Sequence, residues 1–264
     1  MNDNMKFFTD GAAYEQLMGR WSRLVGDIFL DWLAAPKALR WLDVGCGNGA
    51  FTETIIARCA PAEVQGVDPS DAQIAYGRTR EAAKLAQFRI GDAQALPFEN
   101  ASFDVAAMAL VISFVPDAAK AAAEMVRVVR PGGWVAGYMW DIPGGGLPLA
   151  PFHNAAQALG LKAPLGPPGA EVSRLANMQA LWKEARLDAV ESRRIDVEVS
   201  FTDFDEFWQS NTTLSNPLAQ FLRALPTADL ERVRDWLRKS LPHDASGRIR
   251  YGAFANSVKG RVPG

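Results

Sequence analysis

LRWLDVGCGNGAFT, residues 39–52, is the stretch that decides the fold of this chain. An apolar run reaches Val44, and Gly45, Gly47 and Gly49 follow it at alternate positions before a helix-forming segment, 50–59. A strand, a glycine turn and a helix in this order leave bare backbone groups open to a polar ligand. The stretch therefore predicts a ligand-binding turn.

Strand and helix patterns alternate along the chain on both sides of this turn. Strands are expected at 39–44, 63–67, 87–90, 103–111, 134–140, 189–201 and 248–259. Amphipathic spacing and capping residues predict helices at 11–34, 50–59, 72–86, 117–129, 152–159, 173–185, 203–211, 217–224 and 227–241. Such alternation is typical of a doubly wound α/β sheet, which binds ligands at the carboxyl ends of its parallel strands.

The chain is expected to form a single domain over residues 1–264, with three functional regions. Residues 1–36 are predicted to be an N-terminal helical lid, and 37–142 a cofactor-binding core. Residues 143–245 are predicted to be a helical substrate cap, interrupted by the sixth strand. Glycines and prolines crowd the start of this last region, which favours a long lid or binding loop.

Composition narrows the class of partner. A formal net charge of −2, a pI near 5.8 and scattered basic residues predict no nucleic-acid interface. No apolar run is long enough to predict a membrane span, and the N-terminus has no secretory pattern, so the cytoplasm is the expected compartment. The two cysteines have no metal-ligand spacing, so no metal is expected. The oligomeric state is not predicted.

Three aspartates end the first three predicted strands. Asp68 lies at the spacing from the glycine turn at which a carboxylate accepts hydrogen bonds from ribose hydroxyls, and Asp92 is placed to meet an adenine amino group. Asp43 directly precedes the turn, where its carboxylate would repel a pyrophosphate and attract a cation. A nucleoside cofactor that carries positive charge is therefore favoured over a dinucleotide such as NAD.

Four motifs resemble those of class I S-adenosylmethionine-dependent methyltransferases, in the small-molecule form of ubiquinone and menaquinone biosynthesis. They are LDVGCGNG (42–49), GVDPS (66–70), GDAQALPF (91–98) followed by SFDV (102–105), and RVVRPGG (127–133). The resemblance covers about residues 10–140. It implies a Rossmann-like sheet of order 3-2-1-4-5-7-6 with an antiparallel last strand, and S-adenosylmethionine as the cofactor.

The resemblance also implies individual roles. Gly45, with Gly47 and Gly49 beside it, would meet the methionyl part, and Asp43 would support its ammonium. Asp68 would bind the ribose, and Pro69 would line the adenine. The remaining implied contacts are Asp92 and the Ala93 amide at the adenine edge, Leu110 at the methionyl side, and Tyr14 and Arg20 in an N-terminal element that closes over the cofactor, with Arg20 on its carboxylate.

Methyl transfer from a sulfonium requires positioning and exclusion of water more than covalent help, so a missing catalytic triad does not exclude an enzyme. A general base is needed only for an acceptor that is protonated at neutral pH. His153, Tyr138 and Asp141 are the candidates, each with packing or surface exposure as the alternative. The stripe Phe201, Phe204, Phe207 and Trp208 either lines an apolar pocket or packs a core.

The sequence therefore predicts an enzyme that methylates a small molecule. A non-catalytic S-adenosylmethionine sensor or partner subunit has the same motifs and stays open as the alternative. The acceptor, and whether O, N, S or C is methylated, are not predicted.

Overall fold

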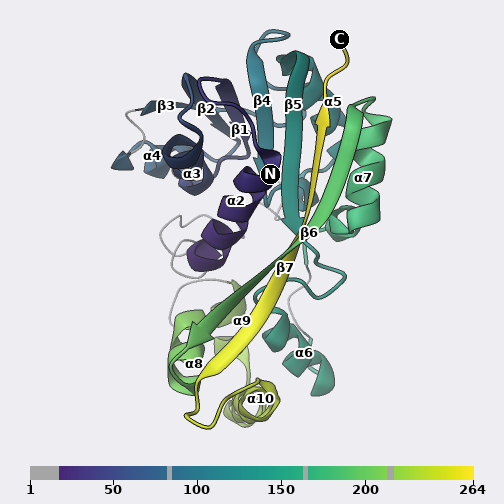
Figure 1. The fold of residues 1–264 in the computed structure, drawn as a ribbon. Helices are drawn as coiled ribbons and strands as arrows, with labels where there is room; N and C mark the ends of the chain where they lie inside the picture. The colour runs from purple at the N-terminus through teal and green to yellow at the C-terminus, as the bar shows by residue number, and fades with distance from the viewer. Residues whose placement is uncertain (1–17, 82–84, 163–165, 213–216) are drawn as a thin grey trace.

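The computed structural model describes residues 18–81, 85–162, 166–212 and 217–264 (Figure 1). Seven strands form one sheet in the order β3-β2-β1-β4-β5-β7-β6. Their bounds are β1 Arg40–Val44, β2 Glu63–Asp68, β3 Ala86–Ile90, β4 Phe103–Ala109, β5 Val129–Trp140, β6 Asp188–Phe201 and β7 Ile249–Arg261. β1 to β5 are parallel and β7 is antiparallel to both its neighbours. The predicted fold class, order and orientation are confirmed.

Helices cover both faces of the sheet. The helices are α2 Arg20–Leu33, α3 Ala50–Cys59, α4 Asp71–Gly77, α5 Ala118–Val128, α6 Ala150–Ala158, α7 Leu175–Glu184, α8 Phe204–Thr212, α9 Pro217–Ala224 and α10 Thr227–Ser240. Successive strand residues face opposite sides, so Trp41 packs with α2 and α3 while Leu42 packs with α5 and α7. Both side chains are fully buried, as parallel strands between two helical layers require.

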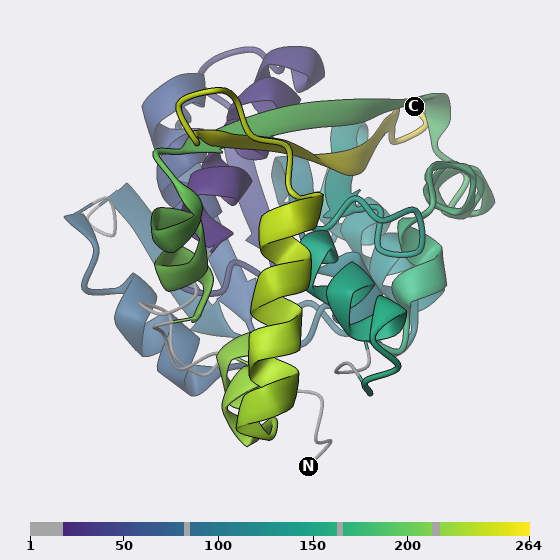
Figure 2. The same ribbon diagram turned by 90° about the horizontal axis from the view of Figure 1, so that it is seen from below.

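A two-stranded ribbon extends beyond the sheet. β7 pairs with β6 along its whole length, but with β5 only from Ala255 onward, so 249–254 and the end of β6 project past the sheet. Helices α6, α8, α9 and α10, here called the cap helices, gather around this ribbon beyond the carboxyl ends of β4 and β5 (Figures 1 and 2). The fold thus places a second helical layer over the edge where the sequence predicts the ligand.

Among the described residues, the two largest errors in the predicted boundaries concern α4 and β5. The helix expected over 72–86 ends at Gly77, because the chain turns there and carries Arg80 back to the glycine turn. The fifth strand begins at Val129 instead of Trp134, and 130–133 bulge out of the ladder between the pairs Phe103–Val129 and Val105–Trp134. The part of the first predicted helix before residue 18 lies outside the described residues, and so does Tyr14.

Candidate functional site

The glycine turn joins β1 to α3 at the carboxyl edge of the sheet. Gly45, Gly47 and Gly49 have φ of 73°, 50° and 80°, which side chains with a Cβ rarely adopt. A Cβ on Gly45 would lie 2.6 Å from Val111, whereas a Cβ on Gly47 would meet nothing within 4 Å. The turn is therefore packed tightly at Gly45 and open at Gly47, where a ligand could approach the backbone.

Asp43 is fully buried immediately before the turn. Its Oδ2 accepts a hydrogen bond from Thr52 Oγ1 at 2.6 Å, and its Oδ1 has no partner among the described residues. Burial raises the pKa of this carboxyl to about 7, the Thr52 hydrogen bond opposes that rise, and the charge of Asp68 adds to it. An unpartnered buried carboxylate oxygen costs free energy unless a donor or a cation reaches it. The site therefore suits a positively charged ligand.

Asp68 links the second strand to the turn. Its Oδ2 accepts from the Gly47 amide and its Oδ1 from the Ser70 amide, both at 2.9 Å. Burial raises the pKa of Asp68, and these two backbone hydrogen bonds oppose the rise. Each carboxylate oxygen keeps a second acceptor position, as an interaction with ribose hydroxyls would require. Pro69, the next residue, is exposed.

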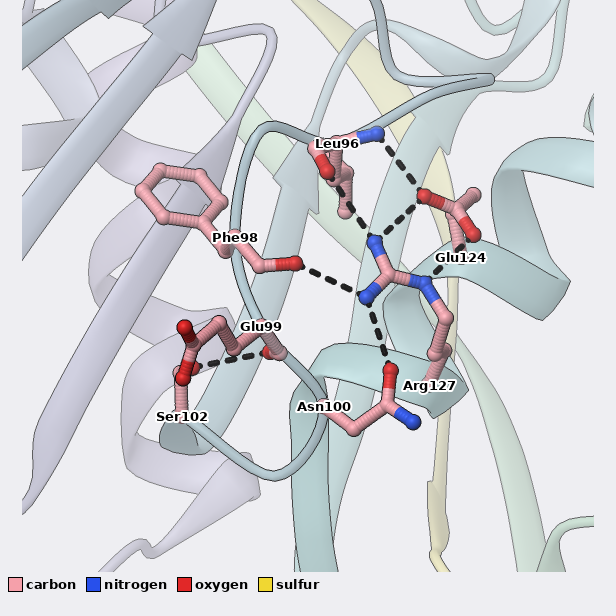
Figure 3. A network of polar contacts seen from close by, with 7 residues as sticks. All are labelled: Leu96, Phe98, Glu99, Asn100, Ser102, Glu124 and Arg127. Atoms are coloured by element: carbon pink, nitrogen blue, oxygen red, sulfur yellow. Dashed lines mark hydrogen bonds and ion pairs between the residues drawn. The ribbon is translucent and has the colours of Figure 1, made fainter.

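The loop after β3 is held by a network of hydrogen bonds (Figure 3). Arg127, on α5, donates to the carbonyls of Leu96 and Phe98 and pairs with Glu124 at 2.7 Å. Glu124 in turn accepts from the Leu96 amide at 2.8 Å. The network fixes the segment that follows Asp92 and Ala93, and Asp92 itself is exposed and accepts from the Gln94 amide.

Two other predicted cofactor residues lie at the same edge of the sheet. Leu110 follows β4 with φ 61° and donates its amide to the Tyr138 carbonyl at 2.8 Å. Arg20 begins α2, donates to the Ser200 carbonyl at 3.1 Å and lies 5.6 Å from the centre of the Phe201 ring. These contacts tie Arg20 to the projecting end of β6, and its role toward a cofactor carboxylate stays a prediction.

Two catalytic candidates, Tyr138 and Asp141, make contacts within the fold. Tyr138 is 2% exposed and packs against Phe29 and Phe51 in the core under α2 and α3. Asp141 accepts from the Gly144 amide at 2.8 Å and from Asn256 Nδ2 at 2.9 Å, so its carboxylate shapes the loop after β5. Whether either side chain also faces the acceptor stays a prediction.

His153 and the aromatic stripe belong to the cap. His153 lies on α6, half-buried, with Nδ1 3.1 Å from the Leu149 carbonyl. Phe207, fully buried, packs against Phe152, Phe201 and Tyr251. The aromatic stripe was predicted either to line an apolar pocket or to pack a core, and Phe207 and Phe201 pack in a core.

Sequence reasoning missed Ser113. It lies in the 3-10 turn Ile112–Phe114 that follows β4, is fully buried, and its Oγ has no partner within the described ranges. Its carbonyl accepts from the Gly169 amide at 3.2 Å. The available signal was one hydroxyl in the apolar run ALVISFV (109–115), at the carboxyl end of a strand.

The described residues contain no group of three or more His, Cys, Asp or Glu side chains that could hold a metal ion. Among those same residues, no helix is both long and apolar enough to span a membrane. The groups available at this edge of the sheet include the buried carboxylate of Asp43, the half-buried carboxylate of Asp68, open backbone groups and apolar side chains.

Solved structures of known proteins share the fold of this chain. A putative methyltransferase of Haloferax volcanii, solved with the Trm112 activator, superposes with a TM-score of 0.63 at 15% identity, covering 100% of this chain and 99% of that one. A Haemonchus contortus phosphoethanolamine N-methyltransferase 2, solved with S-adenosylhomocysteine, gives 0.58 at 18% identity, covering 99% and 58%. The fold is that of the Rossmann-like methyltransferases.

The sequence comparisons identify the family of the core segment. Residues 42–137 match the model of a family described as a methyltransferase domain. A ubiquinone/menaquinone biosynthesis C-methyltransferase, UbiE, from Dinoroseobacter shibae is 36% identical over 135 residues, or 48% of this chain and 54% of that protein. The chain spans about half the length of the curated relatives it matches. The segment 42–137 is thus similar to this methyltransferase family, and the predicted class I resemblance is confirmed.

Proposed function

We propose that this protein transfers a methyl group from S-adenosylmethionine to a small-molecule acceptor and releases S-adenosylhomocysteine. The proposal assigns residues 37–142 to the cofactor, 1–36 to a lid and the cap region 143–245 to the acceptor. The family of the segment 42–137 supports it, as do relatives named as methyltransferases.

One observation carries the choice of cofactor. Asp43 Oδ1 is buried without a partner beside a glycine turn that has open space at Gly47. An ammonium near this oxygen, directly or through water, would satisfy it, while a pyrophosphate at the same turn would place negative charge beside Asp43 and Asp68. These residues fit S-adenosylmethionine and disfavour NAD.

The protein's contribution to the reaction is positioning. The bound cofactor supplies an electrophilic methyl group on a sulfonium. Asp68 would hold the ribose through the acceptor positions that Gly47 and Ser70 leave free, and Asp43 would orient the methionyl end. With both ends fixed, the methyl group can be presented in line to a nucleophile, and the cap excludes water.

The acceptor is inferred to be largely apolar. Leu110 and Ile142 are partly exposed at the ends of β4 and β5, and each packs against both cores of the sheet. No described carboxylate or histidine is established as a base, which favours an acceptor that is nucleophilic at neutral pH or loses its proton to solvent. His153 remains the base to test if the acceptor is a hydroxyl or a carbon acid.

The test is release of S-adenosylhomocysteine from S-adenosylmethionine with a panel of quinols, phenols, amines and thiols. We expect turnover with at least one acceptor, and its loss in Asp68→Ala. Binding of the cofactor without turnover on any member would support the non-catalytic sensor instead. No binding of S-adenosylmethionine would overturn both readings.

A further inference from the structure

Arg80 contacts the glycine turn from the side that faces α4. It follows α4 in the chain, and its side chain is only 10% exposed. Nε donates to the Asn48 carbonyl at 2.6 Å, and Nη1 pairs with Glu53 Oε2, in the first turn of α3, at 2.5 Å. The guanidinium also lies 5.6 Å from the centre of the Tyr76 ring. One arginine thus joins α4, the turn and α3.

The peptide that Arg80 holds is the one between Asn48 and Gly49. Its N–H donates to the Cys46 carbonyl at 2.9 Å, and its C=O accepts from Arg80. Gly49 has φ 80° and no side chain, so this peptide could rotate between alternative turn types at low cost if its carbonyl were free. Both the N–H and the C=O of this peptide are therefore hydrogen-bonded, and Arg80 supplies a contact that comes from outside the turn.

The turn is fixed from two sides. Asp68 accepts from the Gly47 amide at 2.9 Å, and Arg80 donates to the Asn48 carbonyl one residue later. Glu53 balances the guanidinium charge, and its ion pair with Arg80 lies mostly out of water, since the side chains are 10% and 32% exposed. This pairing keeps a positive charge beside the turn from opposing a cationic ligand.

We propose that Arg80 is a positioning residue that selects the cofactor-binding conformation of the glycine turn. The inference rests on the proposed function, because the bound ligand is taken to be S-adenosylmethionine. Without Arg80, the Asn48–Gly49 peptide samples other orientations, and only the fraction in the competent one binds. Apparent affinity falls in proportion to that fraction.

The experiment is calorimetric titration of S-adenosylmethionine into wild-type protein, Arg80→Ala and Arg80→Lys, with thermal unfolding of each. We expect roughly tenfold weaker binding for Arg80→Ala. Arg80→Lys, which keeps the charge but cannot donate to two acceptors in a fixed fork, should fall between. Arg58→Ala is the matched control. Arg58 lies on α3 and forms ion pairs with Asp27 and Asp31 of α2, away from the glycine turn. Its affinity should equal that of the wild type.

A second readout separates turn conformation from general stability. Amide hydrogen exchange at Gly49 should accelerate in ligand-free Arg80→Ala and stay unchanged in Arg58→Ala. Wild-type affinity in Arg80→Ala, or equal losses in Arg80→Ala and Arg58→Ala, would overturn the proposal. If wild-type protein binds no S-adenosylmethionine, the proposed function fails, while Gly49 exchange still tests whether Arg80 holds the turn.

Discussion

Asp43 is completely buried, and within the part of the chain that the structure describes its side chain accepts one hydrogen bond, from Thr52. Because its folded pKa, about 7, lies above the value near 3.9 of an unfolded chain, the folded state binds the proton more tightly. The stability that this proton contributes is fully present below about pH 4 and is lost as the pH rises through about 7. Asp68, with its pKa also raised, contributes with the same sign.

Asp43→Asn should therefore stabilise the ligand-free protein above pH 7, by up to about 4 kcal/mol, because the neutral amide can accept from Thr52 without ionising in the core. The gain should shrink toward about pH 5, where Asp43 is protonated in the wild type. Urea unfolding at both pH values measures it. The same variant should bind S-adenosylmethionine more weakly, and a stable variant with unchanged affinity would contradict the role given to Asp43.

Gly45 is predicted to tolerate no residue with a side chain. Gly45→Ala would place a Cβ 2.6 Å from Val111 at a φ of 73°, so we expect a loss of about 2–4 kcal/mol in the free energy of unfolding. Gly145→Ala is the matched control, because Gly145 has φ 78° with nothing within 4 Å of its Cβ position. For Gly145→Ala, urea unfolding should show a loss of about 1 kcal/mol in the free energy of unfolding. Equal losses would mean that the Val111 contact contributes nothing.

Among the elements, the loop between β3 and β4 depends on α5. Arg127→Ala removes the donors to the Leu96 and Phe98 carbonyls, and we expect a loss of about 1–3 kcal/mol by urea unfolding. Arg174→Ala is the control. It breaks an exposed ion pair with Glu171, also three residues away in sequence, and should leave the free energy of unfolding unchanged. If the two variants showed the same free energy of unfolding, the contacts of Arg127 with the loop would stabilise the protein no more than an exposed ion pair does.

Element patterns were predictable where the cause is local. The strand before Gly45, the turn and the Asp117 cap, which accepts from the Lys120 amide, depend on neighbouring residues and were predicted correctly. The length of α4 was not, since the chain leaves the helix at Gly77 to bring Arg80 to Asn48, a contact 32 residues apart. Sequence periodicity carries no information on such a contact.

Across the whole molecule, the cap has a core of its own. Phe207→Ala should destabilise the cap helices, by about 3–5 kcal/mol locally, because Phe207 is fully buried against Phe152 and Phe201. Amide hydrogen exchange should accelerate in α8 and α10 and stay slow in β1 and β4. Uniform acceleration through the sheet would show that cap and sheet open as one unit.

The distinction between local and distant contacts also explains which site residues could be predicted. Asp43 and Asp68 follow from their place at strand ends beside a glycine turn, and the structure brings them together through Gly47. The contacts of Tyr138 with Phe29 and of Asp141 with Asn256 could not be predicted, because these partners are distant in the sequence. A position at the end of a strand carries no information on such contacts.

Acidic side chains around the glycine turn are proposed to select a cationic nucleoside cofactor. Calorimetric titration of S-adenosylmethionine and NAD into wild-type protein, Asp68→Ala and the surface control Asp31→Ala tests it most directly. We expect binding of S-adenosylmethionine but not NAD, at least tenfold weaker binding in Asp68→Ala, and wild-type affinity in Asp31→Ala. Binding of NAD in competition with S-adenosylmethionine, or unchanged affinity in Asp68→Ala, would contradict it.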